Sequence, residues 1–259
     1  MGRKTKVALS VGAAGAAAWA ASKAIIRPNA RPGKKALQFE GPVVIQQLTD
    51  TANSEQLAAE AASLGVHGFA VDVRLTVHEE IILVNNEHPE SSHCLLKDMI
   101  IQYPHLLFII RIADSPDTYE GSLMPSKLWK LLEECGAQEQ VAVLSQYDEQ
   151  VDRFNLYTQH MAAAGAGITE LKQAYAAYTS RFGHLYHPRT DLFVLAGKIG
   201  PFQPASEGFI QFLNKLNITV YAENYAADDV IKLVSSGISG FITDSPKSTM
   251  VQLDMLLEH

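Results

Sequence analysis

Apolar and polar positions change in blocks along most of the chain. Short apolar runs of strand type alternate with longer segments whose apolar residues recur at helical spacing. The predicted strands are 42–47, 67–73, 81–84, 105–112, 141–144, 192–196, 218–222 and 240–243. The run HLLFIIRI at 105–112 is apolar almost throughout, which is typical of a parallel strand covered on both faces.

Helical segments separate most of these strands. The predicted helices are 55–65, 95–102, 128–135, 148–162, 169–182, 208–216, 227–235 and 249–257. The link at 77–80 is too short for a helix, so the strand at 81–84 is expected to follow a tight turn. Eight strands with intervening helices predict right-handed βαβ units and an α/β fold of the TIM-type (β/α)8 barrel class.

The first 26 residues follow a different pattern. Three basic residues at positions 3–6 precede an uncharged run at 7–21, VALSVGAAGAAAWAA, and Lys23 interrupts the apolar sequence that follows. This pattern is typical of an export signal or a signal anchor, although the run is short for a membrane span, which needs about 20 apolar residues. We expect an N-terminal hydrophobic helix at 1–26 that is either a signal peptide or a membrane anchor, with an Ala-rich helix packed on the body as the alternative.

The change in sequence pattern after residue 26 also predicts the domain organisation. Residues 27–40 hold two prolines and a glycine among charged residues and are predicted to be a linker. Residues 41–259 are predicted to form the barrel domain. The protein is expected to be membrane-anchored or exported, and the sequence leaves cleavage and orientation open because basic residues flank both sides of the apolar run.

Charge divides the chain in the same way. Eight of the 21 basic residues precede Glu40, the first acidic residue, so the remainder carries 13 basic and 28 acidic residues and a net charge of −15. An acidic body argues against a nucleic-acid partner, whereas the basic N-terminal segment favours an anionic membrane surface. Cys94 and Cys135 have no zinc-ligand spacing, and either two buried thiols or a disulfide fits their positions.

Candidate chemistry is expected where the strands end. In a barrel of this class the reactive residues lie at the carboxyl ends of the strands and in the loops that follow. Those ends carry Gln47, Asp72, Asn85, Arg111, Ser145, Lys198, Glu223, Asn224 and Asp244. A charge pair between Asp72 and Arg111 is expected, because their strands are predicted to be neighbours.

Three stretches of the sequence resemble one enzyme family. The segments 53–87, 141–151 and 217–246 are similar to the opening, middle and end of glycerophosphodiester phosphodiesterases, and the closing GISGFITDSP at 237–246 is the most specific of these motifs. The resemblance covers roughly residues 42–250. It implies a barrel that hydrolyses glycerol phosphodiesters with two histidines as general acid and base and a divalent metal held by carboxylates.

This sequence departs from the family pattern at most of those positions. The two histidine positions fall on Gln47 and Asn85, and two metal carboxylates are replaced by Ala70 and Ile109, so that only Asp72 remains. An amide cannot exchange a proton near neutral pH, and a single carboxylate does not hold Ca²⁺ or Mg²⁺, which need several oxygen ligands. We therefore expect a degenerate site without a cofactor, with Ca²⁺ or Mg²⁺ relevant only if residual activity survives.

The sequence leaves three functional hypotheses open. The first is a membrane-tethered binding barrel for a glycerol-phosphate-type ligand or a partner protein, whose ligand-binding residues are Gln47, Asp72, Asn85, Arg111, Tyr221 and Asn224. The second is an active metal-dependent phosphodiesterase that uses non-standard groups such as Asp72, Asp50, Glu223 or His88. The third is a structural membrane-associated barrel whose pocket is filled by side chains.

Overall fold

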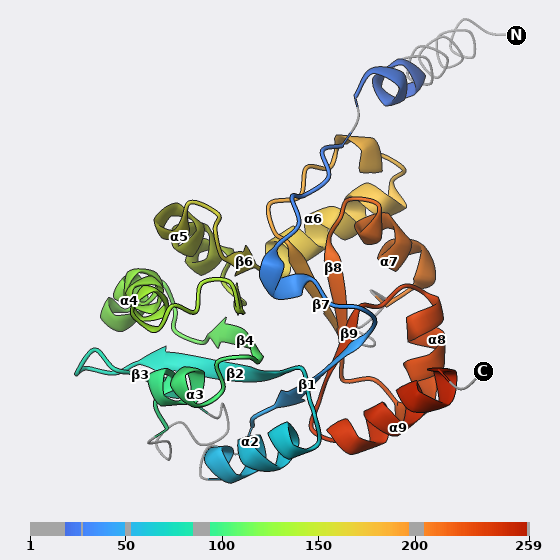
Figure 1. Cartoon of the computed structure of the whole chain (residues 1–259). Coiled ribbons are helices and arrows are strands. Elements are labelled where there is room, and N and C mark those ends of the chain that lie inside the picture. Colours follow the sequence, from blue (N-terminus) through green and yellow to red (C-terminus); the bar gives the residue numbers. More distant parts are fainter. Residues whose placement is uncertain (1–18, 27, 50–52, 85–93, 197–204, 258–259) are drawn as a thin grey trace, which may run out of the picture.

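The computed structural model describes residues 19–26, 28–49, 53–84, 94–196 and 205–257. Within these residues, parallel strands surround a common axis and helices cover them on the outside (Figure 1). The barrel strands are β1 (Val43–Gln47), β2 (Gly68–Leu75), β4 (Leu107–Ile112), β5 (Val141–Ser145), β6 (Ala163–Ala164), β7 (Leu192–Ala196), β8 (Thr219–Glu223) and β9 (Gly240–Thr243). The predicted TIM-type barrel is therefore confirmed.

The strands follow the order β6-β5-β4-β2-β1-β9-β8-β7. The two ends of this order meet through a parallel bridge between Gly165 and Leu192, which nearly closes the barrel. A Cβ atom on Gly165 would lie 2.3 Å from Leu144 Cγ, so the close approach of β5 and the segment after β6 requires a residue without a side chain. We call the carboxyl ends of the strands the mouth of the barrel and their amino ends the base.

Helices connect the strands on the outer surface. They are α2 (Ser54–Ser63), α3 (Leu96–Gln102), α4 (Tyr119–Cys135), α5 (Asp148–Thr158), α6 (Ile168–Thr179), α7 (Glu207–Asn214), α8 (Val230–Ser235) and α9 (Pro246–Leu257). The described residues also form three short 3-10 helices, η1 (Lys35–Leu37), η2 (Gly183–Leu185) and η3 (Ala227–Asp229). A helix that follows a barrel strand begins at the mouth, and every such helix except α9, the last element, then leads back to the base, where the next strand begins.

One predicted barrel strand was wrong and another was missed. The segment predicted as the third barrel strand forms β3 (Ile81–Leu83), which pairs antiparallel with β2 outside the barrel order. The tight turn at 76–80 reverses the chain, and a strand that returns directly cannot run parallel to the previous one. The eighth barrel strand is β6, whose two alanines give no strand signal and whose surroundings have the composition of a helix.

The apolar residues form layers on the two faces of the strands. Inside the barrel lie small and branched side chains such as Ile45, Ala70 and Ile109, together with the ring of Tyr221. On the outer face the strands pack against the helices in two large clusters. The apolar run predicted at 105–112 is thus covered on both faces, as expected for β4.

The segment expected to be a linker packs against the base of the barrel. Arg31 forms an ion pair of 2.6 Å with Asp191, a carboxylate that is almost fully buried, and the Arg31 backbone N–H donates to Leu216. Ala36 in η1 is buried within the cluster inside the barrel. Residues 28–40 therefore connect the N-terminal region to the barrel and also cover its base.

The predicted N-terminal hydrophobic helix lies mostly outside the described residues, which include helical structure at 19–25. No helix in the described part of the chain has the length and apolar character needed to cross a membrane. Cys94 is buried, Cys135 is partly exposed, and both are free thiols, which excludes the disulfide between them.

Candidate functional site

Four polar side chains meet at the mouth of the barrel. Gln47 ends β1, Glu223 ends β8, and Asp72 and Arg111 lie directly opposite each other in the register of β2 and β4. All four belong to strands whose carboxyl ends surround the barrel axis, and each alternates along its strand with residues that face the helices. The fold therefore brings together residues that are separated by up to 176 positions in the sequence.

Arg111 is the centre of this group. Its Nη2 atom donates to Glu223 Oε1 at 2.6 Å, and its Nη1 atom lies 3.9 Å from Asp72 Oδ1, so the expected charge pair with Asp72 is present. With its amide oriented to satisfy both neighbours, Gln47 donates to Glu223 at 3.0 Å and accepts from Arg111 at 3.3 Å. We call Gln47, Asp72, Arg111 and Glu223 the mouth cluster.

The mouth cluster crosses the barrel. In the strand order, β4 and β8 are separated by β2, β1 and β9, so in an eight-stranded barrel Arg111 and Glu223 stand on opposite walls. The three charged side chains retain between 17% and 20% of their exposed surface. A guanidinium that is bonded to one carboxylate and near a second leaves the cluster with one net negative charge at the opening.

A small cavity opens beside the mouth cluster. It has a volume of about 260 Å³ and is lined by Arg111, Ser145, Gln146, Gly167 and Glu223 together with apolar residues of β5, β7 and α6. Ser145 is buried and its hydroxyl donates to the carbonyl of Ile112 at 2.8 Å. The polar groups at this opening are suited to hydrogen-bonding a small polar ligand, with Arg111 as the cation available to an anionic group.

The donor set does not fit a divalent metal. Among the described residues, no three His, Cys, Asp or Glu side chains stand close enough to hold a metal ion together. In the mouth cluster the space between Asp72 and Glu223 contains the guanidinium of Arg111. Ala70 and Ile109, which stand where the family resemblance implies carboxylates, are buried inside the barrel and offer no oxygen ligand.

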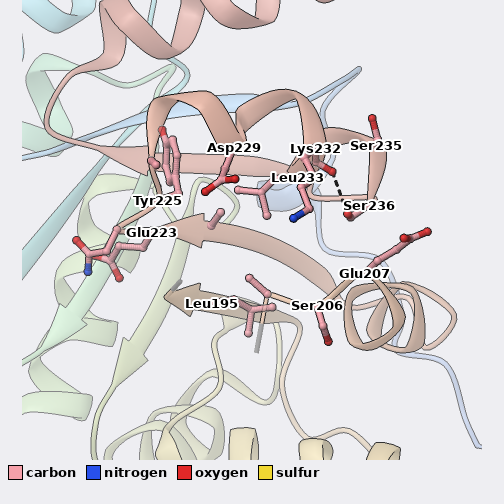
Figure 2. A pocket seen from close by; sticks show the side chains of 14 residues that line it. Leu195, Ser206, Glu207, Glu223, Tyr225, Asp229, Lys232, Leu233, Ser235 and Ser236 are labelled. Carbon is pink, nitrogen blue, oxygen red and sulfur yellow. Dashed lines mark hydrogen bonds between the residues drawn. The ribbon is translucent and has the colours of Figure 1, made fainter. Parts of the chain in front are cut away.

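A larger groove lies beside β8 and has a volume of about 650 Å³. Figure 2 shows Glu207, Asp229 and Lys232 around this groove, with Glu223 at one end. Asn224 lines it as well and adopts a left-handed backbone conformation with φ of 53°. The turn after β8 thus directs Asn224 toward the groove between α7 and α8, whereas Glu223 takes part in the mouth cluster.

The predicted ligand-binding residues therefore have different positions. Gln47, Asp72 and Arg111 lie together at the mouth, and Asn224 lines the neighbouring groove. Tyr221 lies in the cluster inside the barrel, its hydroxyl has no hydrogen-bond partner among the described residues, and burial raises its pKa. Asn85 lies outside the described residues.

Sequence reasoning missed the principal partner of Arg111. Glu223 stands at a predicted strand end, but the sequence gives no reason to pair it with a residue 112 positions away. The sequence signal that could have indicated the pair is the position of each residue in its strand. Glu223 is the last residue of β8, Arg111 is the second-last residue of β4, and both alternate with apolar neighbours. Only the closure of the barrel shows that the two side chains face each other.

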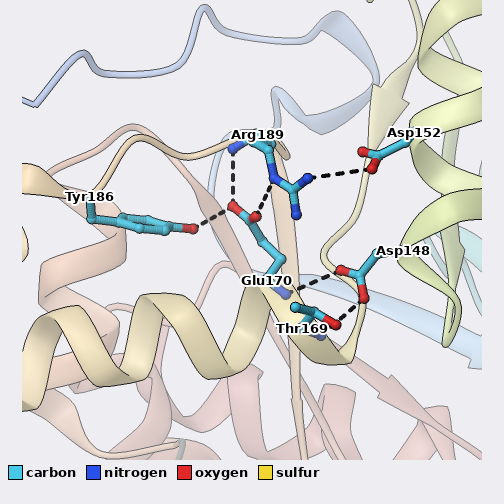
Figure 3. A network of polar contacts seen from close by, with 6 residues as sticks. All are labelled: Asp148, Asp152, Thr169, Glu170, Tyr186 and Arg189. Atoms are coloured by element: carbon cyan, nitrogen blue, oxygen red, sulfur yellow. Dashed lines mark hydrogen bonds and ion pairs between the residues drawn. The ribbon is translucent and has the colours of Figure 1, made fainter.

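A second polar network lies between α5, α6 and the segment before β7 (Figure 3). The carboxylate of Glu170 is 1% exposed and accepts hydrogen bonds from the Tyr186 hydroxyl at 2.5 Å and from Arg189 Nε at 2.9 Å. Arg189 also lies 3.4 Å from Asp152. Burial together with the hydrogen bond to Glu170 raises the pKa of Tyr186.

The first turn of α6 is joined to the same network by Asp148. The carboxylate of Asp148 accepts from the backbone N–H groups of Thr169 and Glu170, both at 3.1 Å. Burial alone would raise the pKa of Asp148, but its hydrogen bonds with Thr169 and Glu170 outweigh burial and hold the pKa below its ordinary value. This arrangement satisfies amides at the start of α6 and fixes the helix against α5.

Solved structures of glycerophosphodiester phosphodiesterases share this fold. A Silicibacter pomeroyi structure assigned as a glycerophosphoryl diester phosphodiesterase superposes with a TM-score of 0.65 at 10% identity, covering 86% of this chain and 98% of the other. A Parabacteroides distasonis glycerophosphodiester phosphodiesterase has a TM-score of 0.61 at 12% identity, with 87% and 100% covered. The glycerophosphoryl diester phosphodiesterase domain of a Mycobacterium tuberculosis protein has a TM-score of 0.60 at 12% identity, with 83% and 100% covered.

These likenesses extend over nearly the whole of each solved chain, so the barrel matches them as a complete fold. No protein-family model matches the sequence, and no curated protein sequence matches it. At identities of 10–12% the comparisons establish the shared fold, and the residues at the mouth decide what can be inferred about chemistry.

Proposed function

We propose that this protein is a member of the glycerophosphodiester phosphodiesterase family that has lost hydrolysis and acts as a membrane-tethered binding barrel. The observation that carries the proposal is the position of Arg111, which forms a 2.6 Å ion pair with Glu223 and lies 3.9 Å from Asp72. The guanidinium is the cation of the mouth cluster and stands between its two carboxylates without a metal, although the net charge of the cluster is negative. The shared fold supports the family, and the mouth cluster supports the loss of catalysis.

The chemistry of the mouth favours binding over turnover. Hydrolysis of a phosphodiester requires a group that takes up a proton and a group that releases one, and Gln47 does neither because its amide does not titrate near neutral pH. Asp72 and Glu223 are both engaged with Arg111. The mouth cluster therefore provides hydrogen-bond donors and acceptors but no acid–base pair.

A glycerol-phosphate-type ligand fits the chemistry of the cavity beside Arg111. The cavity of about 260 Å³ accommodates a small polar group, and its lining includes a guanidinium, a hydroxyl and amides. In such a complex, Arg111 would exchange part of its contact with Glu223 for a phosphate oxygen, since guanidinium groups bind carboxylate and phosphate with the same fork geometry.

The tether is proposed from the N-terminal sequence. An uncharged run at 7–21 follows three basic residues, and residues 28–40 then connect this run to the base of the barrel. The basic residues before Glu40 favour the anionic surface of a membrane. The chain is therefore proposed to be held at a membrane by the region before residue 27.

The experiment compares hydrolysis and binding in the same preparation. We expect no release of alcohol from glycerophosphocholine or from a chromogenic phosphodiester, with or without Ca²⁺ or Mg²⁺, and we expect glycerol phosphate to raise the melting temperature of the protein. An Arg111→Lys variant should lose most of that shift because a lysine cannot form the bidentate contact. Metal-dependent turnover that disappears in Asp72→Ala would establish an active phosphodiesterase instead, and no shift with any glycerol phosphate would leave the structural barrel as the function.

A further inference from the structure

The N-terminal segment meets the barrel at its base. The Trp19 indole donates to the carbonyl of Arg181 at 3.3 Å, and the Ser22 hydroxyl lies 2.8 Å from His184 Nε2 in η2. Figure 1 shows this segment near α6 and on the side of the barrel away from α2 and α9. Because η2 precedes β7, these contacts place residues 19–25 at the end of the barrel opposite to the mouth cluster.

Exposed apolar side chains gather at this contact. Ile25 is 80% exposed, and Phe182 and Leu185, which flank the contact with Ser22, are each 44% exposed. Lys23 and Arg181, which are close to these residues in the sequence, are exposed as well. We call Lys23, Ile25, Arg181, Phe182 and Leu185 the basal patch. Large apolar residues next to basic ones are the composition of surfaces that lie in a membrane interface.

Charge is segregated between the two ends of the barrel. The sequence contains no acidic residue before Glu40 and none from position 171 to 190, and these two stretches supply the basal patch. The acid that follows the second stretch, Asp191, is buried against Arg31. At the mouth, the loops at 113–118 and 224–229 contain two acidic residues each and neither lysine nor arginine.

We propose that the basal patch lies on the surface of an anionic lipid bilayer, with the mouth of the barrel directed away from the membrane. An anionic surface attracts the base and repels the acidic loops of the mouth, so both ends favour the same orientation. The uncharged run at 7–21 immediately precedes the segment that contacts η2, which brings the proposed tether and the basal patch to one face. The inference rests on the proposed tether for its setting, but it concerns a surface of the barrel itself.

The test uses the full chain and measures how close each end of the barrel lies to lipid. A fluorophore is attached at Leu185→Cys in one variant and at Ile168→Cys in another, both carrying Cys135→Ser, while Cys94 is buried. Ile168 is a matched control, since it is 49% exposed and begins α6 at the mouth. The vesicles contain phosphatidylcholine with phosphatidylglycerol and a headgroup nitroxide quencher, and circular dichroism verifies folding.

The expected result is strong quenching of the label at position 185 and little at position 168. Substitution Arg181→Glu should lower the association of the basal patch with these vesicles by roughly tenfold or more, since each basic residue near the surface contributes on the order of 1 kcal/mol. Lys247→Glu, the same charge change in the exposed first turn of α9 at the mouth, should leave quenching unchanged. Equal quenching at both labels in vesicle-bound protein would overturn the inference.

Vesicle binding measured at high and low salt concentrations distinguishes the proposed basal patch from the proposed tether. In about 1 M salt electrostatic contacts are screened, whereas an inserted apolar helix stays bound. Protein that stays on vesicles in high salt but shows no selective quenching at position 185 in low salt refutes the basal patch and leaves the tether. Protein that is released by salt but shows selective quenching in low salt supports the basal patch and refutes the tether.

Discussion

The mouth cluster and the network around Glu170 each contain an arginine–glutamate pair, but the two pairs have different roles. In the network, the carboxylate of Glu170 is 1% exposed and accepts three hydrogen bonds, from Tyr186 and from the backbone and side chain of Arg189. In the mouth cluster, Arg111 and Glu223 remain 20% and 17% exposed beside a cavity. The buried carboxylate of Glu170 has all its partners inside the protein and holds elements together, although Arg189 itself is 48% exposed. The carboxylate of Glu223 is partly exposed at a strand end beside a cavity, so its arginine is able to exchange partners with a ligand.

The largest expected effect comes from the buried network. Arg189→Met leaves the carboxylate of Glu170 in the interior with the Tyr186 hydroxyl and one backbone N–H as its partners. Leaving a buried carboxylate without its cation costs on the order of 3 kcal/mol even though Arg189 itself is 48% exposed, so the free energy of unfolding measured with urea should fall by about that amount. Arg153→Met, which breaks the exposed pair with Glu149, is the control and should change it by less than about 0.5 kcal/mol.

An intermediate effect is expected at the mouth. Arg111→Met removes the cation between Asp72 and Glu223 and should lower the free energy of unfolding by about 1–2 kcal/mol, because both carboxylates stay partly solvated. The variant then presents two carboxylates and the Gln47 carbonyl to one another, which are oxygen ligands suited to Ca²⁺. Millimolar Ca²⁺ should therefore raise the melting temperature of Arg111→Met and leave the unsubstituted protein unchanged.

Arg74→Met is the matched control for this change, since Arg74 lies 4.0 Å from Asp114 and is 41% exposed. It should show neither the destabilisation nor the response to Ca²⁺. If Arg111→Met also fails to respond to Ca²⁺, the guanidinium does not serve as the cation of the mouth. The functional contrast between the mouth cluster and the network around Glu170 would then be refuted.

The smallest effect depends on pH and concerns Asp148. Its pKa is lower in the folded protein than in the unfolded chain, so its stabilisation is present above the unfolded value of about 3.9 and is lost as pH falls through the lower folded pKa. Asp148→Asn should lower the free energy of unfolding by about 1 kcal/mol at pH 7, and the difference from the unsubstituted protein should shrink as the pH falls below about 4. A difference that is constant with pH would mean that the amide side chain replaces the carboxylate contacts without a charge contribution.

The sequence predicted the barrel because its strands are apolar runs and its helices have regular apolar spacing. It failed at β6, where the closure of the barrel depends on two alanines and on Gly165, whose missing side chain makes room for Leu144. The segment of β3 was wrongly predicted to be a barrel strand. Its residues favour a strand in any setting, but the turn before it forces an antiparallel pair with β2. Local preference indicates that a segment is extended, but partners in space decide which sheet it joins.

What the sequence determined by itself is the set of side chains available at the strand ends. Gln47, Asp72, Arg111 and Glu223 are there because the period of two along a strand and the end of each apolar run place them there. Their arrangement was decided only by the tertiary structure: closing the barrel sets β4 and β8 on opposite walls, and the 2.6 Å contact between Arg111 and Glu223 then crosses it. The position of residues 28–40 at the base was also decided by the tertiary structure. Arg31 forms an ion pair with the buried Asp191 and donates its backbone N–H to the carbonyl of Leu216, and no sequence pattern predicts these contacts.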